Sequence, residues 1–425
     1  MAEDFYKEDR STNYCVKCQK VDPSPVRKFG KLRCHKCETP LRTKGVGLAL
    51  SGGGYRAAVF HLGSLWRLNE LGWLKKLDEV TSVSGGSITA GWLGLQWKKL
   101  KFGEDGVATN FVEEVVNPLR EFCSHCIEVE GFFCGLTQPY RRKLFGKATL
   151  QNLPSDKEGP RFTIYATSLQ TGVSVRFSHP YLADYELDKK IESPHIQLAK
   201  AVAASSAFPI FMAPVILRFQ PSEWKDWDKK SKKDKKGNLL SRSQKKKLLS
   251  TMILTDGGVY DNLGLERVFD RYSTVLVSDA GAPFSVTPGA FGLGLNRFSI
   301  LKRADSTITE QTRRLRKRWA IADFEDKKAR GTYWGIDTKI ENYEPTEEKE
   351  KKEFLPPLLK DSKTTEKLSK ISTRLMGLSQ EKQEALINWS YALADAAMRC
   401  WMLEPGAKPG RLPFPKYYRR KRRGG

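Results

Sequence analysis

Short apolar runs alternate with helical patterns in the first quarter of the chain. Residues 46–50 (VGLAL) form a continuous apolar run, which is typical of a buried parallel strand. Apolar residues then recur at helical spacing over 57–71, and Gly72 ends the pattern. Residues 79–83 (EVTSV) are strand-like, and a second helix is predicted over 88–100. This order of strand, turn and helix predicts a βαβα unit on a parallel sheet.

The rest of the chain continues this alternation of strands and helices. Strands are predicted where short apolar or alternating runs lie between turn residues, and helices where apolar residues recur at helical spacing. We expect the last helix to be amphipathic and to dock on the core. The predicted strands are 162–167, 173–177, 252–255 and 274–278, and the predicted helices are 196–207 and 379–402.

The length and composition of the chain suit a folded protein with about two or three domains. Of its 425 residues, 40% are hydrophobic, which excludes wholesale disorder. We expect a small module at 1–43, an α/β domain at 44–404 and a basic tail at 405–425. Within the domain we expect a lysine-rich insertion at 221–250 and a charged, mobile excursion at 341–366.

The net charge is strongly positive, because 73 lysines and arginines face 49 acidic residues, giving +24. Residues 229–247 carry ten basic side chains and one aspartate, and residues 416–425 carry six basic and no acidic side chains. Such segments attract polyanions, so an anionic membrane surface or a nucleic acid is an expected partner. A solvated, disordered loop and tail is the equally open alternative, because like charges repel.

The sequence lacks the signals of membrane insertion and of secretion. No apolar run reaches the roughly 18–20 residues that span a bilayer. Residues 1–9 are acidic and polar, unlike a secretory signal. We therefore expect a cytoplasmic protein.

Four of the eight cysteines form two Cys-x-x-Cys pairs with 15 residues between them. Thiolates at this spacing can surround one tetrahedral ion, and the neighbouring lysines and arginines help to keep them deprotonated. All four positions are sulfur, so the ion would be structural and would supply the folding energy of a short module. We predict one Zn²⁺ on Cys15, Cys18, Cys34 and Cys37; the alternative is four unrelated reduced thiols.

Ser84 is the strongest candidate nucleophile. It lies between a predicted strand and a predicted helix, in Ser82-Val83-Ser84-Gly85-Gly86. A sharp turn of this kind holds a serine in a strained conformation and exposes its Oγ at a helix N-terminus. Ser82 stands where the usual G-x-S-x-G elbow has glycine, and an ordinary Ser/Gly turn is the alternative.

A glycine run follows the first predicted strand. Gly52, Gly53 and Gly54 can point several N–H groups into one cavity, as an oxyanion hole requires. The stretch lacks the spacing of nucleotide-binding loops, which is the alternative use of such a turn. Arg56 is a candidate partner for a substrate phosphate, or else a helix-surface arginine.

Asp256 is the candidate base. It ends a predicted strand, in Thr255-Asp256-Gly257-Gly258, and a serine nucleophile needs a base. None of the five histidines lies in a convincing motif at the end of a strand. A Ser–Asp dyad is therefore the economical interpretation, although Asp-Gly-Gly on its own is a common turn.

These blocks, in this order, resemble the three blocks of patatin-like phospholipases, in particular the bacterial acyl hydrolases. The glycine block also resembles that of the cytosolic phospholipases of the same superfamily. Four further stretches support the likeness, which covers about residues 45–400 but not the cysteine module. The three blocks are Ser51–Arg56, Ser82–Gly86 and Asp256–Gly258, and the supporting stretches are 165–172 (YATSLQTG), 201–209 (AVAASSAFP), 277–280 (VSDA) and 311–318 (QTRRLRKR).

The resemblance implies a three-layer α/β/α domain with a mainly parallel sheet, beside a zinc-ribbon-like module. It implies a phospholipase A or lysophospholipase that acts through an acyl-enzyme, without a metal ion in catalysis and with peripheral membrane association. Ser84 would be the nucleophile, Asp256 the base and Arg56 the phosphate ligand, and the oxyanion donors would be Gly52, Gly53, Gly54 and Gly85. The alternatives are a catalytically silent scaffold and a module that binds nucleic acid or protein through the cysteine cluster and the tail.

Overall fold

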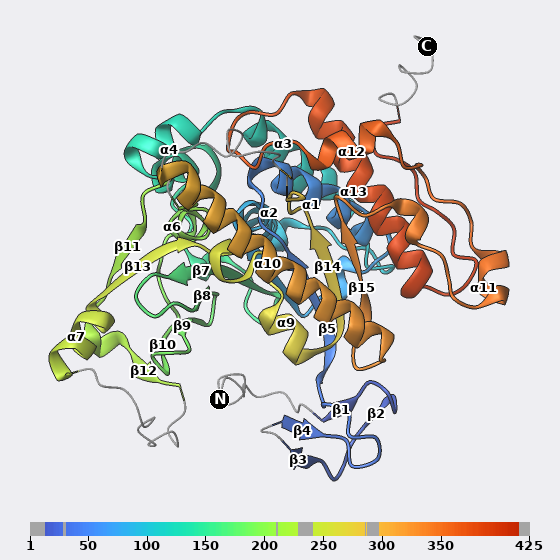
Figure 1. The fold of residues 1–425 in the computed structure, drawn as a ribbon, viewed down its shortest axis with the longest axis horizontal. Helices are drawn as coiled ribbons and strands as arrows, with labels where there is room; N and C mark the ends of the chain where they lie inside the picture. Colours follow the sequence, from blue (N-terminus) through green and yellow to red (C-terminus); the bar gives the residue numbers. More distant parts are fainter. Residues whose placement is uncertain are drawn as a thin grey trace.

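The computed structural model describes residues 13–28, 31–209, 211–227, 241–284, 286 and 297–415. One large sheet lies at its centre, and a small cysteine-bearing module precedes the first strand of that sheet (Figure 1). The module consists of two short antiparallel hairpins. Their strands are β1 (Tyr14–Cys15), β2 (Lys20–Val21), β3 (Val26–Lys28) and β4 (Lys31–Arg33).

Five neighbouring strands of the large sheet run parallel. The apolar runs that the sequence predicted as buried strands lie here, and every residue of β6 and β7 is buried. Covered on both faces, such strands need no polar alternation. In spatial order the parallel strands are β7 (Arg161–Ser168), β6 (Glu79–Val83), β5 (Thr43–Leu50), β14 (Tyr272–Asp279) and β15 (Arg330–Gly335).

An antiparallel extension continues the sheet beyond β7, so the sheet as a whole is mixed. Hairpins connect most of these strands, which explains their antiparallel pairing. The strands are β8 (Ser174–Phe177), β9 (Tyr181–Asp184), β10 (Lys189–Glu192), β12 (Lys225–Asp226), β11 (Val215–Arg218) and β13 (Thr251–Asp256).

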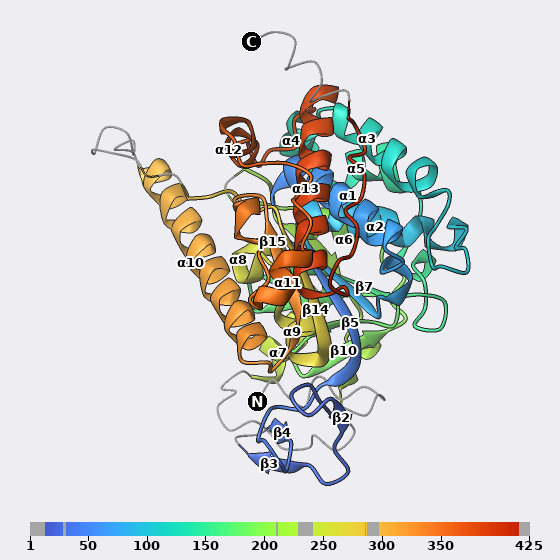
Figure 2. The same cartoon turned by 90° about the vertical axis from the view of Figure 1, so that its right-hand side faces the viewer.

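Helices cover both faces of the parallel strands, which confirms the three-layer α/β/α prediction. Figure 2 shows α1, α2, α6 and α13 on one side of the sheet and α8, α9 and α10 on the other. On the first side lie α1 (Gly54–Glu70), α2 (Gly85–Gln96), α6 (Leu198–Ser205) and α13 (Gln380–Trp401), and on the second α8 (Gly258–Asp261), α9 (Glu266–Arg271) and α10 (Arg297–Glu325).

Shorter helices lie around the edges of the domain. They are α3 (Asn117–Ser124), α4 (Glu128–Cys134), α5 (Thr137–Tyr140), α7 (Arg242–Ser250), α11 (Glu348–Glu353) and α12 (Lys363–Ser369), joined in places by single 3-10 or π turns. In the part of the chain that the structure describes, no helix combines the length and apolarity needed to cross a bilayer.

The strand register brings two distant parts of the chain together. On one edge of β7, β6 pairs in parallel and ends with Val83 opposite Tyr165. On the same edge, β13 pairs antiparallel and ends with Asp256 opposite Ala166. Strand β8 occupies the other edge of β7. Strands β6 and β13 therefore run toward each other and end at adjacent positions.

Two predictions differ from the structure in detail. The predicted amphipathic helix at the C-terminal end is α13, which is buried almost all round from Ala385 to Cys400, because it packs on α1 and β15. The charged excursion 341–366 contains α11 and the start of α12. The lysine-rich insertion is described only in part, since residues 228–240 lie outside the described residues. The basic segment 416–425 also lies outside them.

Candidate active site

Ser84 forms a strained elbow between β6 and α2. Its backbone has φ 51° and ψ −120°, a conformation that residues other than glycine rarely adopt. The Ser84 N–H donates to the Ser205 hydroxyl at 2.8 Å, which fixes the turn. Because Ser84 precedes the first residue of α2, its side chain lies at a helix N-terminus, where a developing negative charge is favoured.

Two glycines let the elbow approach the glycine run. A Cβ on Gly85 would lie 2.0 Å from the Gly54 carbonyl oxygen, and a Cβ on Gly86 would lie 2.5 Å from that of Leu50. Neither contact is sterically allowed, so both positions require glycine. A Cβ on Gly52 would lie 3.2 Å from the Ser84 Cβ, so the run passes directly beside the serine.

Asp256 ends β13 beside that elbow. One of its carboxylate oxygens, Oδ1, accepts the Gly258 N–H at 2.7 Å. Burial raises the pKa of Asp256 to about 7, although the Gly258 N–H and the Ser84 hydroxyl both lower it by hydrogen bonding to the carboxylate. A carboxyl group with a pKa near neutrality is suited to accept and return a proton.

The C-terminal end of α6 holds the two loops together. The Ser205 hydroxyl accepts from Ser84, while its carbonyl oxygen accepts the Gly257 N–H at 3.2 Å. The Ala207 carbonyl oxygen accepts the Asp256 N–H at 3.0 Å. The small residues of 201–207 permit this close approach. Ser205 was not among the candidate residues predicted from the sequence.

The family comparison agrees with this arrangement. A comparison with protein-family profiles matched Patatin-like phospholipase over residues 48–269, just over half of the chain. The chain belongs to the patatin-like phospholipase family. The match begins in β5 and includes the glycine run, the elbow and Asp256. Membership places the chain in a family of lipid ester hydrolases.

Solved structures similar to this patatin-like chain are distant in sequence. Human GIVD cytosolic phospholipase A2 has 11% identity and a TM-score of 0.47, covering 83% of this chain and 58% of that one. The same human enzyme with methyl gamma-linolenyl fluorophosphonate has 14% identity and a TM-score of 0.42, covering 83% and 57%. VipD from Legionella pneumophila has 15% identity and a TM-score of 0.28, covering 70% and 57%. The chain thus spans less than two thirds of each, and no curated protein matched it.

The N–H groups of the glycine run differ in what they bond. The Gly52 N–H donates to the Asn262 carbonyl oxygen at 2.9 Å, so it is already occupied. The expectation that Gly52 supplies an oxyanion donor is therefore not met by this structure. The N–H groups of Gly53, Gly54 and Gly85 have no hydrogen-bond partner among the described residues.

Arg56 does not occupy the position expected of a phosphate ligand. It is fully buried in α1, and its guanidinium donates to the carbonyl oxygens of Ala280, Ser369 and Ile371. Its nitrogens therefore hold backbone segments behind the glycine run. Both interpretations made from the sequence, a phosphate ligand and a surface arginine, are wrong for this residue.

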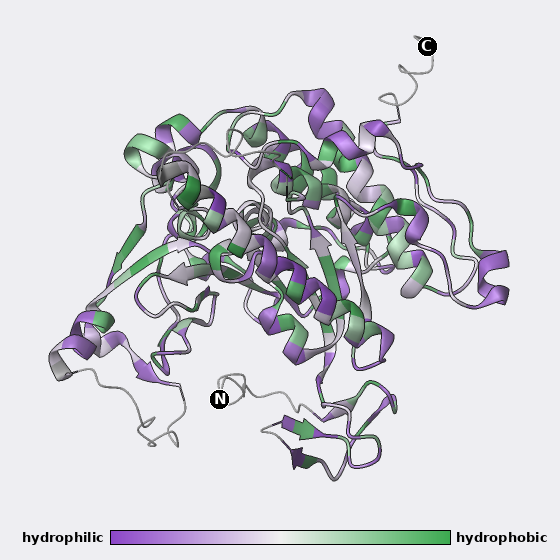
Figure 3. Ribbon diagram, viewed as in Figure 1, coloured by the Kyte–Doolittle hydropathy of each residue, from purple (hydrophilic) through white to green (hydrophobic). Residues whose placement is uncertain are grey.

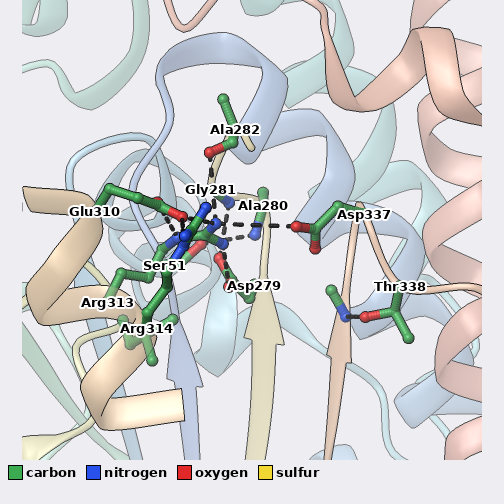
Figure 4. A network of polar contacts seen from close by, with 12 residues as sticks. Ser51, Asp279, Ala280, Gly281, Ala282, Glu310, Arg313, Arg314, Asp337 and Thr338 are labelled. Carbon is green, nitrogen blue, oxygen red and sulfur yellow. Dashed lines mark hydrogen bonds and ion pairs between the residues drawn. The ribbon is translucent and has the colours of Figure 1, made fainter. Parts of the chain in front are cut away.

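A buried ionic network ties α10 to the end of β14, beside the glycine run (Figure 4). Arg313 donates to Asp279 at 2.6 Å and pairs with Glu310 at 2.9 Å. The Ala280 N–H donates to the Ser51 hydroxyl at 2.7 Å. The arginine keeps the pKa of Asp279 low, at about 2, against the effect of burial. The network therefore fixes the position of Ser51, the residue that directly precedes the glycine run.

No histidine of the patatin-like chain bonds to Ser84 or Asp256 in the part that the structure describes. His61 is the histidine near the glycine run, and it is fully buried. Its ring nitrogens contact the Ser51 carbonyl oxygen at 2.9 Å and the Ser278 hydroxyl at 2.8 Å. Burial lowers the pKa of His61 to about 4, so it is neutral and positions Ser51.

The four cysteines of the N-terminal module converge as predicted. Their sulfur atoms all lie within 4.8 Å of one another, with Sγ–Sγ distances of 3.5 Å from Cys37 to both Cys15 and Cys18, and of 3.9 Å from Cys18 to Cys34. A tetrahedral ion with Zn–S bonds of about 2.3 Å requires sulfur atoms about 3.8 Å apart. The cluster therefore fits a metal ion of this kind.

Proposed function

We propose that this chain hydrolyses fatty-acyl esters of membrane phospholipids, as a phospholipase A or lysophospholipase, through Ser84 and Asp256. The observation that carries the proposal is the head-to-head ending of β6 and β13 on β7, which places a strained serine beside a carboxylate of raised pKa. Family membership supports the substrate class. A catalytically silent scaffold would not require Ser84 and Asp256 to lie together.

In the proposed reaction, Asp256 accepts the Ser84 proton as Oγ attacks the ester carbonyl carbon. The N–H groups of Gly53, Gly54 and Gly85 donate to the oxyanion that forms, and they are suited to this because they bond no other described residue. The protonated Asp256 then returns its proton to the departing alkoxide, which leaves an acyl-enzyme. Water attacks the acyl-enzyme, with Asp256 again as base, and releases the fatty acid.

The function is tested by product analysis together with covalent labelling. Wild-type protein is incubated with phospholipid vesicles, and fatty acid and lysophospholipid are measured by mass spectrometry. An alkyl fluorophosphonate, which modifies nucleophilic serines, is expected to stop the release and to label Ser84. Labelling of another serine, or release that continues after Ser84 is fully labelled, would contradict the mechanism, and a silent scaffold would show neither release nor label.

For the cysteine cluster we propose one structural Zn²⁺. All four candidate ligands are thiolates, so the ion would have no open position for a substrate. The module also precedes the start of β5, whereas Ser84 follows the end of the neighbouring, parallel strand β6 (Figure 1). When bound, the ion would cross-link the two hairpins of a module that buries few apolar side chains of its own.

Removal of the metal is therefore expected to unfold the module and to leave ester hydrolysis largely intact. Treatment with a strong chelator should release about one Zn²⁺ per chain, measured by atomic emission. Cys37→Ser should lower zinc content in the same way, whereas Cys400→Ser, a buried cysteine on α13, should not. A protein that retains full zinc content after Cys37→Ser would contradict this site.

A further inference from the structure

The outward face of α10 carries an unusual row of exposed apolar side chains. Leu301, Ile308 and Leu315 are seven residues apart and share one face of the helix. They are 61%, 60% and 42% exposed. Ile300 and Trp319, near the two ends of the row, are 54% and 61% exposed. Figure 3 shows hydrophobic residues interspersed with hydrophilic ones along this helix. Exposed apolar rows of this length are uncommon unless something binds them.

The exposed charge on this face is mainly positive. Arg314 and Arg318 are exposed, and Arg314 also pairs with Glu310 at 2.7 Å. The acidic residues of the helix face elsewhere or are paired: Asp305 is partly buried, Glu310 is buried against Arg313, and Asp323 pairs with Arg42 of the segment that follows the cysteine module. Among the described residues of α10, the exposed acid is Glu325, at its last position.

The inward face of the same helix contacts segments that flank the candidate active site. Arg313 bonds to Asp279 behind the glycine run. Arg316 donates to the Tyr260 carbonyl oxygen at 3.1 Å and lies 3.4 Å from Asp261, in the segment that follows Asp256. A surface that binds the outward face would therefore lie about one helix diameter, or roughly 10 Å, from the loop of the catalytic aspartate.

We infer that the outward face of α10 docks on an anionic phospholipid bilayer and so brings the site to its substrate. Helices that lie in the membrane interface typically combine exposed leucine, isoleucine and tryptophan with neighbouring arginine. Pairing of α10 with the same helix of a second copy is less suited to these charges, because the exposed arginines would find no exposed acid between Ile300 and Trp319. The inference rests on the proposed function for its substrate, whereas the docking itself is measured separately.

The test compares two double variants that add the same charges. Ile308→Glu with Trp319→Glu changes the docking face. Val21→Glu with Leu169→Glu is the matched control, since these side chains are 60% and 55% exposed but lie on β2 and after β7. Binding is measured by co-sedimentation with vesicles of phosphatidylcholine alone or mixed with phosphatidylglycerol. Hydrolysis is measured on the same vesicles and on a soluble para-nitrophenyl ester, and oligomeric state by light scattering.

The α10 variant is expected to bind the mixed vesicles about tenfold more weakly than wild type, and its ratio of vesicle to soluble-ester hydrolysis should fall by a similar factor. The control should keep both values within about twofold of wild type. Wild-type binding by the α10 variant would overturn the inference, as would a wild-type dimer that the variant converts to monomer. If neither wild type nor the two variants hydrolyse either substrate, but only the α10 variant binds vesicles more weakly, the proposed function is wrong and the docking inference is supported.

Discussion

Ser84→Ala is expected to reduce hydrolysis of both soluble esters and phospholipid by about 10⁴-fold or more, because the acyl-enzyme cannot form without its nucleophile. The fold should survive this change. Ser84 already has φ 51°, and alanine would bear about the same backbone strain. The Ser84 N–H, which bonds to Ser205, is retained as well. Initial rates of fatty-acid release measure the loss, and thermal unfolding checks the fold.

The control for this prediction is Ser82→Ala, on the buried strand two residues earlier. The Ser82 hydroxyl accepts from Ser87 at 3.0 Å, donates to the Thr163 carbonyl oxygen at 3.5 Å, and does not contact Asp256 in the described structure. Its loss should change hydrolysis by less than about tenfold, since the bond to Thr163 is long and a neutral hydrogen bond contributes about 1 kcal/mol. If Ser84→Ala kept more than about a hundredth of wild-type activity, another residue would be the nucleophile.

The parts of the site that could be predicted from the sequence are local. Ser84 lies between a recognisable strand and helix, and the glycines around it mark a turn whatever the rest of the chain does. The positive φ at Ser84 and the close contact of Gly85 with Gly54 are what such a turn requires. The four cysteines are local in the same sense, because their spacing alone limits the ways in which they can converge.

The convergence of Ser84 with Asp256 is not local. It depends on both β6 and β13 pairing with the same edge of β7. It also requires β6 to end opposite Tyr165 of β7 and β13 to end opposite Ala166. A shift of two residues in either register would separate the two side chains by about 6–7 Å. The order of the blocks could be recognised through a family likeness, but no periodicity in the sequence encodes this register.

Arg56 shows why a motif residue can be assigned the wrong role. An arginine just after a glycine run suggests an anion site, since both backbone N–H groups and a guanidinium can bind a phosphate. Its actual partners are carbonyl oxygens of Ala280, Ser369 and Ile371, all more than 200 positions away. The row of apolar side chains on α10, in contrast, was given no role from the sequence. Its helical spacing is visible in the sequence, but only the fold shows that this face points outward.

Asp256→Asn is expected to abolish hydrolysis while stabilising the fold at alkaline pH. The amide cannot accept the Ser84 proton, so rates should fall by about 10³-fold or more. Its Oδ1 can still accept the Gly258 N–H, which keeps the loop in place. In the wild type, kcat/KM for a soluble ester should rise with pH and reach half its maximum near pH 7, because Asp256 must be ionised to act as base. The variant should show no such rise.

The stability change follows from the same pKa. Burial raises the pKa of Asp256 from 3.8 to about 7, so between these values the folded chain holds a proton that the unfolded chain has lost. This contribution to wild-type stability is complete below pH 3.8 and disappears as pH rises through 7. Asparagine never ionises, so the Tm of the variant should exceed that of wild type by about 2 °C or more at pH 8 and by less at pH 5. Ser84→Ala keeps Asp256 and should follow the wild-type dependence on pH. If Asp256→Asn were less stable than wild type at pH 8, the ionised Asp256 carboxylate would not destabilise the fold. The proposal that Asp256 is a buried base of raised pKa would then be wrong.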